Sequence, residues 1–173
     1  AIKARKPWVR FGISPAGVAC TDKSVADEYG ITICPAGSDW QYDGIYSDPV
    51  AWVSQNIIDY ISPQVYWTIG AKADYSKIVP WWGVVAHKFG RHNYVSCSLS
   101  DLSGEPSKVS EQELNDDEYN EDRVFARAPE RQDVMMRAFY PQETVNEIVI
   151  NRNSAKEGAP GMVFFSSNKL STR

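Results

Sequence analysis

The chain has 173 residues, of which 43% are apolar and 23% charged, and 22 acidic side chains stand against 18 basic ones. This length fits one domain with a sizeable core and is too short for two. No run of 18 apolar residues and no leader with a charged start, an apolar middle and a cleavage site occurs, so we expect neither a membrane span nor an intact secretion signal. The net charge of −4 argues against a nucleic-acid partner, because such proteins concentrate Lys and Arg on one face.

The first fifty residues predict one short strand inside irregular chain. Residues 1–6 are basic and typical of the end of a helix, and residues 8–13 alternate large apolar with small or polar side chains before Ser14-Pro15. Residues 20–42 are rich in Gly, Ser, Asp and Pro without a sustained period. We therefore expect a strand at 8–13 that ends in a turn, followed by a long loop.

A helix followed by a strand is predicted next. Asp48 can accept the free amide hydrogens of a first helical turn, and Pro49 has no amide hydrogen to leave unpaired. The residues predicted on the buried face of this helix are Val50, Val53 and Ile57. A buried strand is expected at 58–67, ending or bulging near Pro63, which cannot donate a ladder hydrogen bond.

Apolar residues spaced three or four apart mark a second helix at 75–89, with Trp82 in the core and Trp52 of the preceding helix also packing. We expect Pro80 to kink this helix or to fall in its first turn. A short strand is predicted at 94–99.

The last third begins with an acidic excursion at residues 101–133, which holds eleven acidic and four basic side chains. A third helix is expected to open at Tyr140-Pro141, and its predicted core stripe is Val145, Ile148 and Val149. The final strand, at 162–166, is apolar throughout, and we expect it to be buried on both faces.

Alternating strands and helices indicate an α/β fold with parallel strands. The functional face of such folds lies at the carboxyl ends of the strands. The residues expected to gather there are Ser14, Gln64, Tyr66, Trp67, Ser98, Ser100, Ser166 and Ser167. This polar and aromatic set suits a carbohydrate, whose ring faces stack on aromatic side chains while Gln hydrogen-bonds hydroxyl groups.

Within this set, Gln64 and Tyr66 share parity along their strand and should point the same way. Trp67 fits a ligand platform and core packing equally well.

No phosphate-binding glycine loop and no GxSxG elbow occurs, which argues against a nucleotide site and the usual serine hydrolase. Glycoside hydrolysis usually requires two facing carboxyl groups. Asp48 is better explained as a helix cap, and Asp59 lies at the start of its strand, opposite Tyr66. Asp101 is the one acidic residue expected to be able to reach the site.

The cysteines Cys20, Cys34 and Cys97 lack metal-ligand spacing, so no metal site and no cofactor is expected. Cys20 and Cys34 either form a disulfide in an oxidising compartment or stay as thiols. His87 and His92 are interpreted as surface residues.

The segments KPWVRFGISPAGVA, YSDPVAWV, IDYISPQVYW, YSKIVPWWG and GMVFFSS occur in this order. In this they resemble the carboxyl-terminal half of the glycosyl-hydrolase-like 10 family, and the resemblance covers nearly the whole chain outside 101–133. It implies a TIM barrel of which residues 1–173 form a single partial-barrel domain, with strands five to eight. An acidic DGxxxDDYxYP motif of the family precedes these strands and is absent here, while Ala16 replaces a bulky aromatic residue.

The resemblance implies a fragment of a glycoside hydrolase acting on a bacterial or dietary glycan, in the periplasm or at the cell surface. Ser14, Gln64, Tyr66 and Trp67 would line the sugar cleft, and the missing strand would supply the catalytic carboxylates. The alternative is a non-catalytic carbohydrate-binding or cell-surface module. Half a barrel leaves two open sheet edges, so we expect a homodimer or association with the missing amino-terminal half.

Overall fold

The computed structural model describes residues 2–99, 141–154 and 160–165, and these form a mixed α/β structure around one sheet. Four strands, β1 (Gly12–Ile13), β2 (Tyr60–Ile61), β3 (His92–Ser98) and β4 (Pro160–Phe165), lie in the order β1-β2-β3-β4. All three pairings are parallel, as the alternation of elements predicted. The predicted excursion at 101–133, with Asp101, lies outside the described residues.

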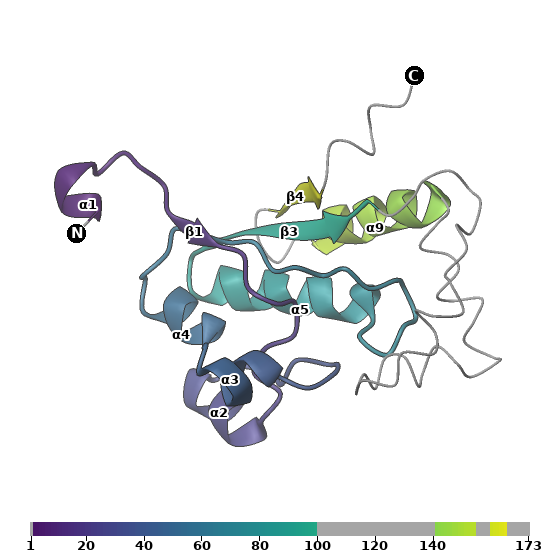
Figure 1. Cartoon of the computed structure of the whole chain (residues 1–173), viewed down its shortest axis with the longest axis horizontal. Coiled ribbons are helices and arrows are strands. Elements are labelled where there is room, and N and C mark those ends of the chain that lie inside the picture. The colour runs from purple at the N-terminus through teal and green to yellow at the C-terminus, as the bar shows by residue number, and fades with distance from the viewer. Residues whose placement is uncertain (1, 100–140, 155–159, 166–173) are drawn as a thin grey trace.

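The two longest helices of the described residues lie beside the sheet. In Figure 1, α5 (Tyr75–Lys88) lies below β3, and α9 (Pro141–Asn153) lies next to β4. The small helices α2 (Lys23–Tyr29) and α3 (Trp40–Ile45) lie beyond α5, and α1 (Ile2–Arg5) stands at the amino-terminal end. No helix among the described residues has the length and apolarity needed to cross a membrane.

The first two strands are shorter than predicted, and Pro63 interrupts the ladder of the second. The backbone pairing continues past them, since Gln64 N donates to Pro15 O at 2.9 Å and Val65 N donates to Ser96 O at 2.9 Å. Pro63 lies between the end of β2 and the bridge at Gln64, which confirms that the strand ends near this residue.

The helix start at Asp48-Pro49 is confirmed. In α4 (Pro49–Ser54) the Asp48 carboxylate accepts a hydrogen bond from Ala51 N at 3.0 Å, and Pro49 occupies the first turn. The prediction that Ile57 packs with this helix is wrong, because its side chain is 54% exposed. The helix ends at Ser54, and Asn56 takes a left-handed backbone with φ 59°, which turns the chain away.

The long loop predicted at 20–42 is wrong in part, because it contains α2 and the first residues of α3. The carboxylate of Asp22 accepts from Ser24 N and caps the start of α2, and Gly30 ends it in a left-handed conformation with φ 61°. Each helix buries a single side chain, Ala26 in α2 and Gln41 in α3. An apolar period therefore could not reveal them.

Helix α5 supplies more of the buried core than any other described element. Trp82 is fully buried, its Nε1 donates to Gly17 O at 2.7 Å, and its ring meets Trp81 edge to face at 4.8 Å. Trp52 and Phe89 pack against the same cluster from partly buried positions. Pro80 lies inside the helix, which continues to Lys88, so its placement in the first turn is wrong; a kink there stays a prediction.

Helix α9 opens at Pro141 as predicted, but the expected core stripe is wrong. Val145 and Val149 are each 49% exposed and Ile148 is half-buried, whereas the buried residues are Glu143, Glu147 and Asn151. Both sets repeat every three or four residues, so periodicity alone does not choose between them. Polar contacts decide the rotation of the helix, since Glu143 Oε1 accepts from Ile69 N at 2.7 Å and Asn151 Nδ2 donates to Gly161 O at 3.2 Å.

The prediction that the last strand is buried on both faces is also wrong, because Val163 is 45% and Phe165 64% exposed. Their side chains share one face of β4, since alternate residues of a strand point the same way. Within the described residues, helices cover only the opposite face of the sheet. The physical reason for the exposure is therefore an uncovered sheet face, and the candidate site is built on it.

Candidate functional site

One face of the sheet carries the functional residues. Cys97 on β3 hydrogen-bonds the Tyr75 hydroxyl of α5 at 3.3 Å, so odd-numbered residues of β3 face the helices. Even-numbered residues of β3 and their register partners form the other face, called here the open face. Its residues are Gly12, Ser14, Ala16, Tyr60, Ser62, Gln64, Tyr66, His92, Tyr94, Ser96, Ser98, Gly161, Val163 and Phe165.

Tyrosines close the part of the open face nearest the amino ends of the strands. The rings of Tyr60 and Tyr94 meet edge to face at 5.3 Å. Each ring lies over a glycine, since a Cβ on Gly12 would come within 2.2 Å of the Tyr60 ring and one on Gly161 within 2.2 Å of the Tyr94 ring. Large and small residues thus interlock in these rows.

Polar side chains stand nearer the carboxyl ends. Gln64 Nε2 donates to the carbonyl oxygen of Ser14 at 3.1 Å and lies 3.3 Å from its Oγ. Below them Ser62 Oγ donates to Tyr94 O at 2.6 Å. The structure therefore brings together Ser14 and Gln64, which the sequence predicted to share a site, and fixes the amide of Gln64 by its hydrogen bonds.

The two aromatic residues predicted for the site differ in their surroundings. Tyr66 is 41% exposed and stacks with Phe165, with ring centroids 6.4 Å apart and planes 20° apart. Trp67 is half-buried against the core, and its ring lies 2.8 Å from the place of a Cβ on Gly17. Tyr66 therefore stands on the open face with Gln64, while Trp67 has a packing contact that accounts for much of its surface.

Phe165 is the residue of this face that sequence reasoning missed. It is the last residue of β4 and pairs in register with Ser98, one of the predicted set. The sequence carries no signal for it, because the run from Met162 to Phe165 is apolar throughout. Only the structure shows that Val163 and Phe165 are exposed while Phe164 is half-buried. Ser100, Ser166, Ser167 and Asp101 lie outside the described residues.

No acidic residue stands on the open face within the described part of the chain. Asp48 caps α4 and also accepts from the Tyr29 hydroxyl at 2.5 Å. Asp59 precedes β2, at the opposite end of the strand from Tyr66, as predicted. There it pairs with Lys3 at 2.7 Å and accepts from Phe11 N at 2.8 Å, and the Lys3 hydrogen bond leads in lowering its pKa to about 2. Asp59 is thus a structural anion that ties the amino-terminal segment to β2.

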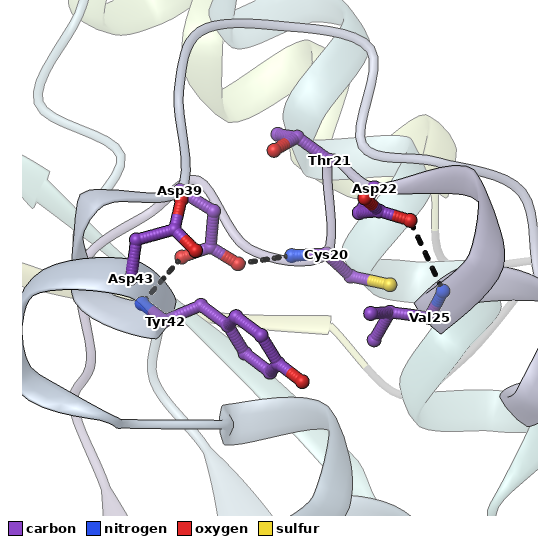
Figure 2. Close-up of a pocket in the computed structure, with 7 residues that line it drawn as sticks. All are labelled: Cys20, Thr21, Asp22, Val25, Asp39, Tyr42 and Asp43. Atoms are coloured by element: carbon purple, nitrogen blue, oxygen red, sulfur yellow. Dashed lines mark hydrogen bonds between the residues drawn. The ribbon is translucent and has the colours of Figure 1, made fainter.

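A separate pocket of about 240 Å³ lies between α2 and α3 and is shown in Figure 2. Three aspartates line it, Asp22, Asp39 and Asp43. Asp39 is buried and accepts from Cys20 N at 2.5 Å and Tyr42 N at 3.2 Å, and burial raises its pKa. Asp22 caps α2 and Asp39 caps α3, while Asp43 lies in the first turn of α3. Within the described residues no group of His, Cys, Asp and Glu could hold a metal ion.

All three cysteines are buried free thiols in this structure. Cys34 N donates to Cys20 O at 3.0 Å, so the two residues are neighbours through their backbones. Burial is the leading cause that raises the pKa of the Cys20 and Cys34 thiols to about 11. Both therefore stay protonated at neutral pH and react slowly as nucleophiles. His87 and His92 are exposed, as predicted.

The fold and this face define a parallel α/β protein whose polar and aromatic groups lie at the carboxyl ends of the strands. The sequence model of the Glycosyl hydrolase-like 10 family matches residues 1–100. This match covers more than half of the chain, so the protein belongs to the Glycosyl hydrolase-like 10 family. Ser14, Gln64, Tyr66 and Trp67 lie inside the matched region, and Phe165 lies beyond it.

Curated relatives agree with this family. The chain is 39% identical over 100 residues to the glycosyl hydrolase YngK of Bacillus subtilis (strain 168). The aligned region covers 54% of this chain and 18% of YngK. The chain is 36% identical over 113 residues to the glycosyl hydrolase DigH of Escherichia coli (strain K12), covering 62% of this chain and 24% of that protein. DigH of Shigella flexneri matches equally well. The chain thus spans less than a quarter of the length of these relatives.

Proposed function

We propose that this chain supplies the sugar-binding half of a glycoside hydrolase cleft, built on strands five to eight of a TIM barrel. The strand order β1-β2-β3-β4, parallel and in chain order, supports this, because barrel strands follow one another in sequence around the sheet. The observation that carries the proposal is the hydrogen-bonded Ser14–Gln64 pair beside exposed Tyr66 on the open face.

The chemistry of these side chains fits a glycan. The Gln64 amide offers donors and an acceptor to sugar hydroxyls, and its Nε2 is oriented by Ser14. An aromatic ring beside it covers the apolar face of a pyranose. The proposed substrate is therefore an oligosaccharide or polysaccharide, a bacterial or dietary glycan, met in the periplasm or at the cell surface.

The catalytic carboxylates are proposed to lie upstream of this chain. Hydrolysis of a glycosidic bond usually needs two carboxyl groups on opposite sides of the scissile bond. Within the described residues the open face carries none, which also favours the second candidate, a carbohydrate-binding or cell-surface module without catalysis.

The free edges of β1 and β4 support a further part of the proposal. Neither outer edge is paired within the described residues, and unpaired parallel strands invite a partner. We propose that upstream strands of the full-length protein, or a second copy, close these edges. Light scattering of the isolated chain checks this: a dimer or larger species is expected, and a stable monomer with intact helices contradicts edge closure by a second copy.

Substitution of Gln64 tests the function. In the full-length protein Gln64→Leu should weaken binding of soluble oligosaccharides about tenfold, because a buried sugar hydroxyl loses its hydrogen bond. Gln55→Leu, at the exposed end of α4, is the matched control and should bind as the unchanged protein does. Titration calorimetry measures binding, and release of reducing ends measures hydrolysis.

The two candidates give different results. If the full-length protein binds a glycan and hydrolyses it, and the Asp101→Asn variant still does so, the result supports a hydrolase whose catalytic carboxylates lie upstream of this chain. Loss of hydrolysis in Asp101→Asn would place a catalytic acid in this chain instead. Binding without hydrolysis favours the non-catalytic module, and no binding to any glycan contradicts both candidates.

A further inference from the structure

The uppermost row of the open face has two aromatic rings over one small residue. Tyr66 lies two residues beyond the bridge between Gln64 and Ser96, which places it in register with Ser98. Phe165 pairs with Ser98 from the other side. Because Ser98 is small, the rings from the two flanking strands meet above it, with centroids 6.4 Å apart and planes 20° apart.

These two rings are more exposed to solvent than the other tyrosine rings of the open face. Phe165 is 64% and Tyr66 41% exposed, whereas Tyr60 and Tyr94, which lie over glycines in the lower rows, are half-buried. The two rings lie nearly parallel in a stack, and much of the Phe165 ring remains open to solvent at the carboxyl end of the sheet. Its neighbours on this face are the polar residues Gln64 and Ser98 and the apolar Val163.

This neighbourhood favours a ligand with mixed polarity. If hydrocarbon side chains covered the rings, the amide of Gln64 and the hydroxyl of Ser98 would be buried beside them, and unpaired buried polar groups are costly. Within the described residues, the hydrogen bonds of Gln64 to Ser14 use Nε2 and leave its Oε1 free to accept. A sugar ring satisfies both needs, because it has a face of C–H groups and a rim of hydroxyls.

We propose that Phe165, supported by the stacked ring of Tyr66, forms the stacking platform for one pyranose ring, and that Phe165 selects sugars whose ring face is free of axial hydroxyls. This inference rests on the proposed function and adds to it a specificity residue from β4, outside the region that matches the family. An axial hydroxyl on the stacked face would hold the sugar ring away from the plane of Phe165. Equatorial hydroxyls would instead point outward at the rim, toward Gln64.

Oligosaccharide binding to the full-length protein tests the platform. The probes are cellohexaose, whose hydroxyls are all equatorial, and mannohexaose, which carries axial hydroxyls. Phe165→Ala should weaken cellohexaose binding about three- to tenfold, the range expected for one aromatic stacking contact. The preference for cellohexaose over mannohexaose should shrink by the same factor.

Two further variants separate stacking from bulk. Phe165→Tyr keeps a flat ring and should bind cellohexaose as the unchanged protein does, while Phe165→Leu keeps apolar volume without a plane and should bind as weakly as Phe165→Ala. Trp8→Ala removes an aromatic residue that is 72% exposed near the amino end of the sheet, and it should change nothing. Unfolding of each variant by urea is followed to show that it remains folded.

The outcomes distinguish this inference from the function on which it rests. If Gln64→Leu weakens binding but Phe165→Ala leaves both affinity and preference unchanged, the platform is wrong and the proposed function stands. Equal binding by the Phe165→Leu and Phe165→Tyr variants also overturns it. If the unchanged protein binds neither hexasaccharide, the platform is wrong, while the proposed function falls only if no other glycan binds either.

Discussion

Helices α5 and α9 lie on the same side of the sheet, yet they pack by opposite chemistry. The buried side chains of α5 include Tyr75, Ile78 and Trp82, all with no exposed surface. The buried face of α9 consists of two glutamates and an asparagine, and its valines face outward. The comparison teaches that the helical period identifies a buried stripe, while tertiary hydrogen bonds decide which of two stripes is buried.

The buried faces of α5 and α9 are held in place by different kinds of contact. Packing of α5 rests on apolar area and close contact, which tolerate no loss of volume. The contacts of α9 are directional, from Glu143 to Ile69 and from Asn151 to Gly161, and they leave Asn151 Oδ1 without a partner. We therefore expect α5 to respond to changes of size and α9 to changes of charge and pH.

The largest effect is expected on the apolar side of the comparison. Trp82→Ala should lower the free energy of unfolding by about 3–5 kcal/mol, because it opens a cavity in the core. It also leaves the carbonyl oxygen of Gly17 without its buried hydrogen-bond donor. Urea denaturation measures the change, and a loss below about 1 kcal/mol would contradict the central role of α5.

An intermediate effect is expected at Glu147. Burial, with the nearby Glu143 carboxyl as a second cause, raises its pKa from an ordinary 4.5 to about 8. The Tyr75 hydroxyl of α5 and the Cys97 thiol of β3 lie around Glu147. Both groups are uncharged at neutral pH, because burial above all raises the pKa of each. The folded chain therefore binds a proton that the unfolded chain has released between these two pKa values.

The sign follows from this difference. Stability from protonated Glu147 is fully present below pH 4.5 and is lost as the pH rises to about 8, above which the loss is complete. Glu147→Gln mimics the protonated form, so its advantage over the unchanged chain should grow across this window to about 1–3 kcal/mol at pH 8.5. Thermal unfolding at several pH values measures it; a pH-independent difference would contradict a protonated Glu147.

The smallest effect is expected on the outer face of α9. Replacement of Val145 or Val149 by Ser should change the free energy of unfolding of the isolated chain by no more than about 0.5 kcal/mol, because half of each side chain is already in water. The matched change Val79→Ser on α5 buries a hydroxyl at a position with no exposed surface and should cost several times more. Similar losses at all three valines would show that the outer face of α9 is covered.

Sequence reasoning succeeded where local chemistry decides the structure. The cap at Asp48-Pro49, the core position of Trp82 and the break at Pro63 each depend on the properties of one or two residues. The parallel order of the strands followed from their alternation with helices. These features need no knowledge of distant partners.

Prediction from the sequence failed where contacts between distant parts of the chain determine the structure. Helices α2 and α3 are defined by their caps, Asp22 and Asp39, and carry almost no apolar stripe. The rotation of α9 depends on the amide of Ile69, far away in the chain. In the candidate site, Ser14 and Gln64 could be paired from strand ends alone, whereas the stack of Tyr66 on Phe165 required the register of β4 against β3.

The long separation between β3 and β4 has a consequence for how the chain folds. Residues 99–159 connect these two parallel strands, while 62–91 connect β2 and β3. Closing the longer loop costs more chain entropy before any pairing compensates for it. We therefore expect β1, β2, β3 and α5 to assemble first, and β4 with α9 to join last. Amide hydrogens of β4 should accordingly gain protection from exchange after those of β3 during refolding.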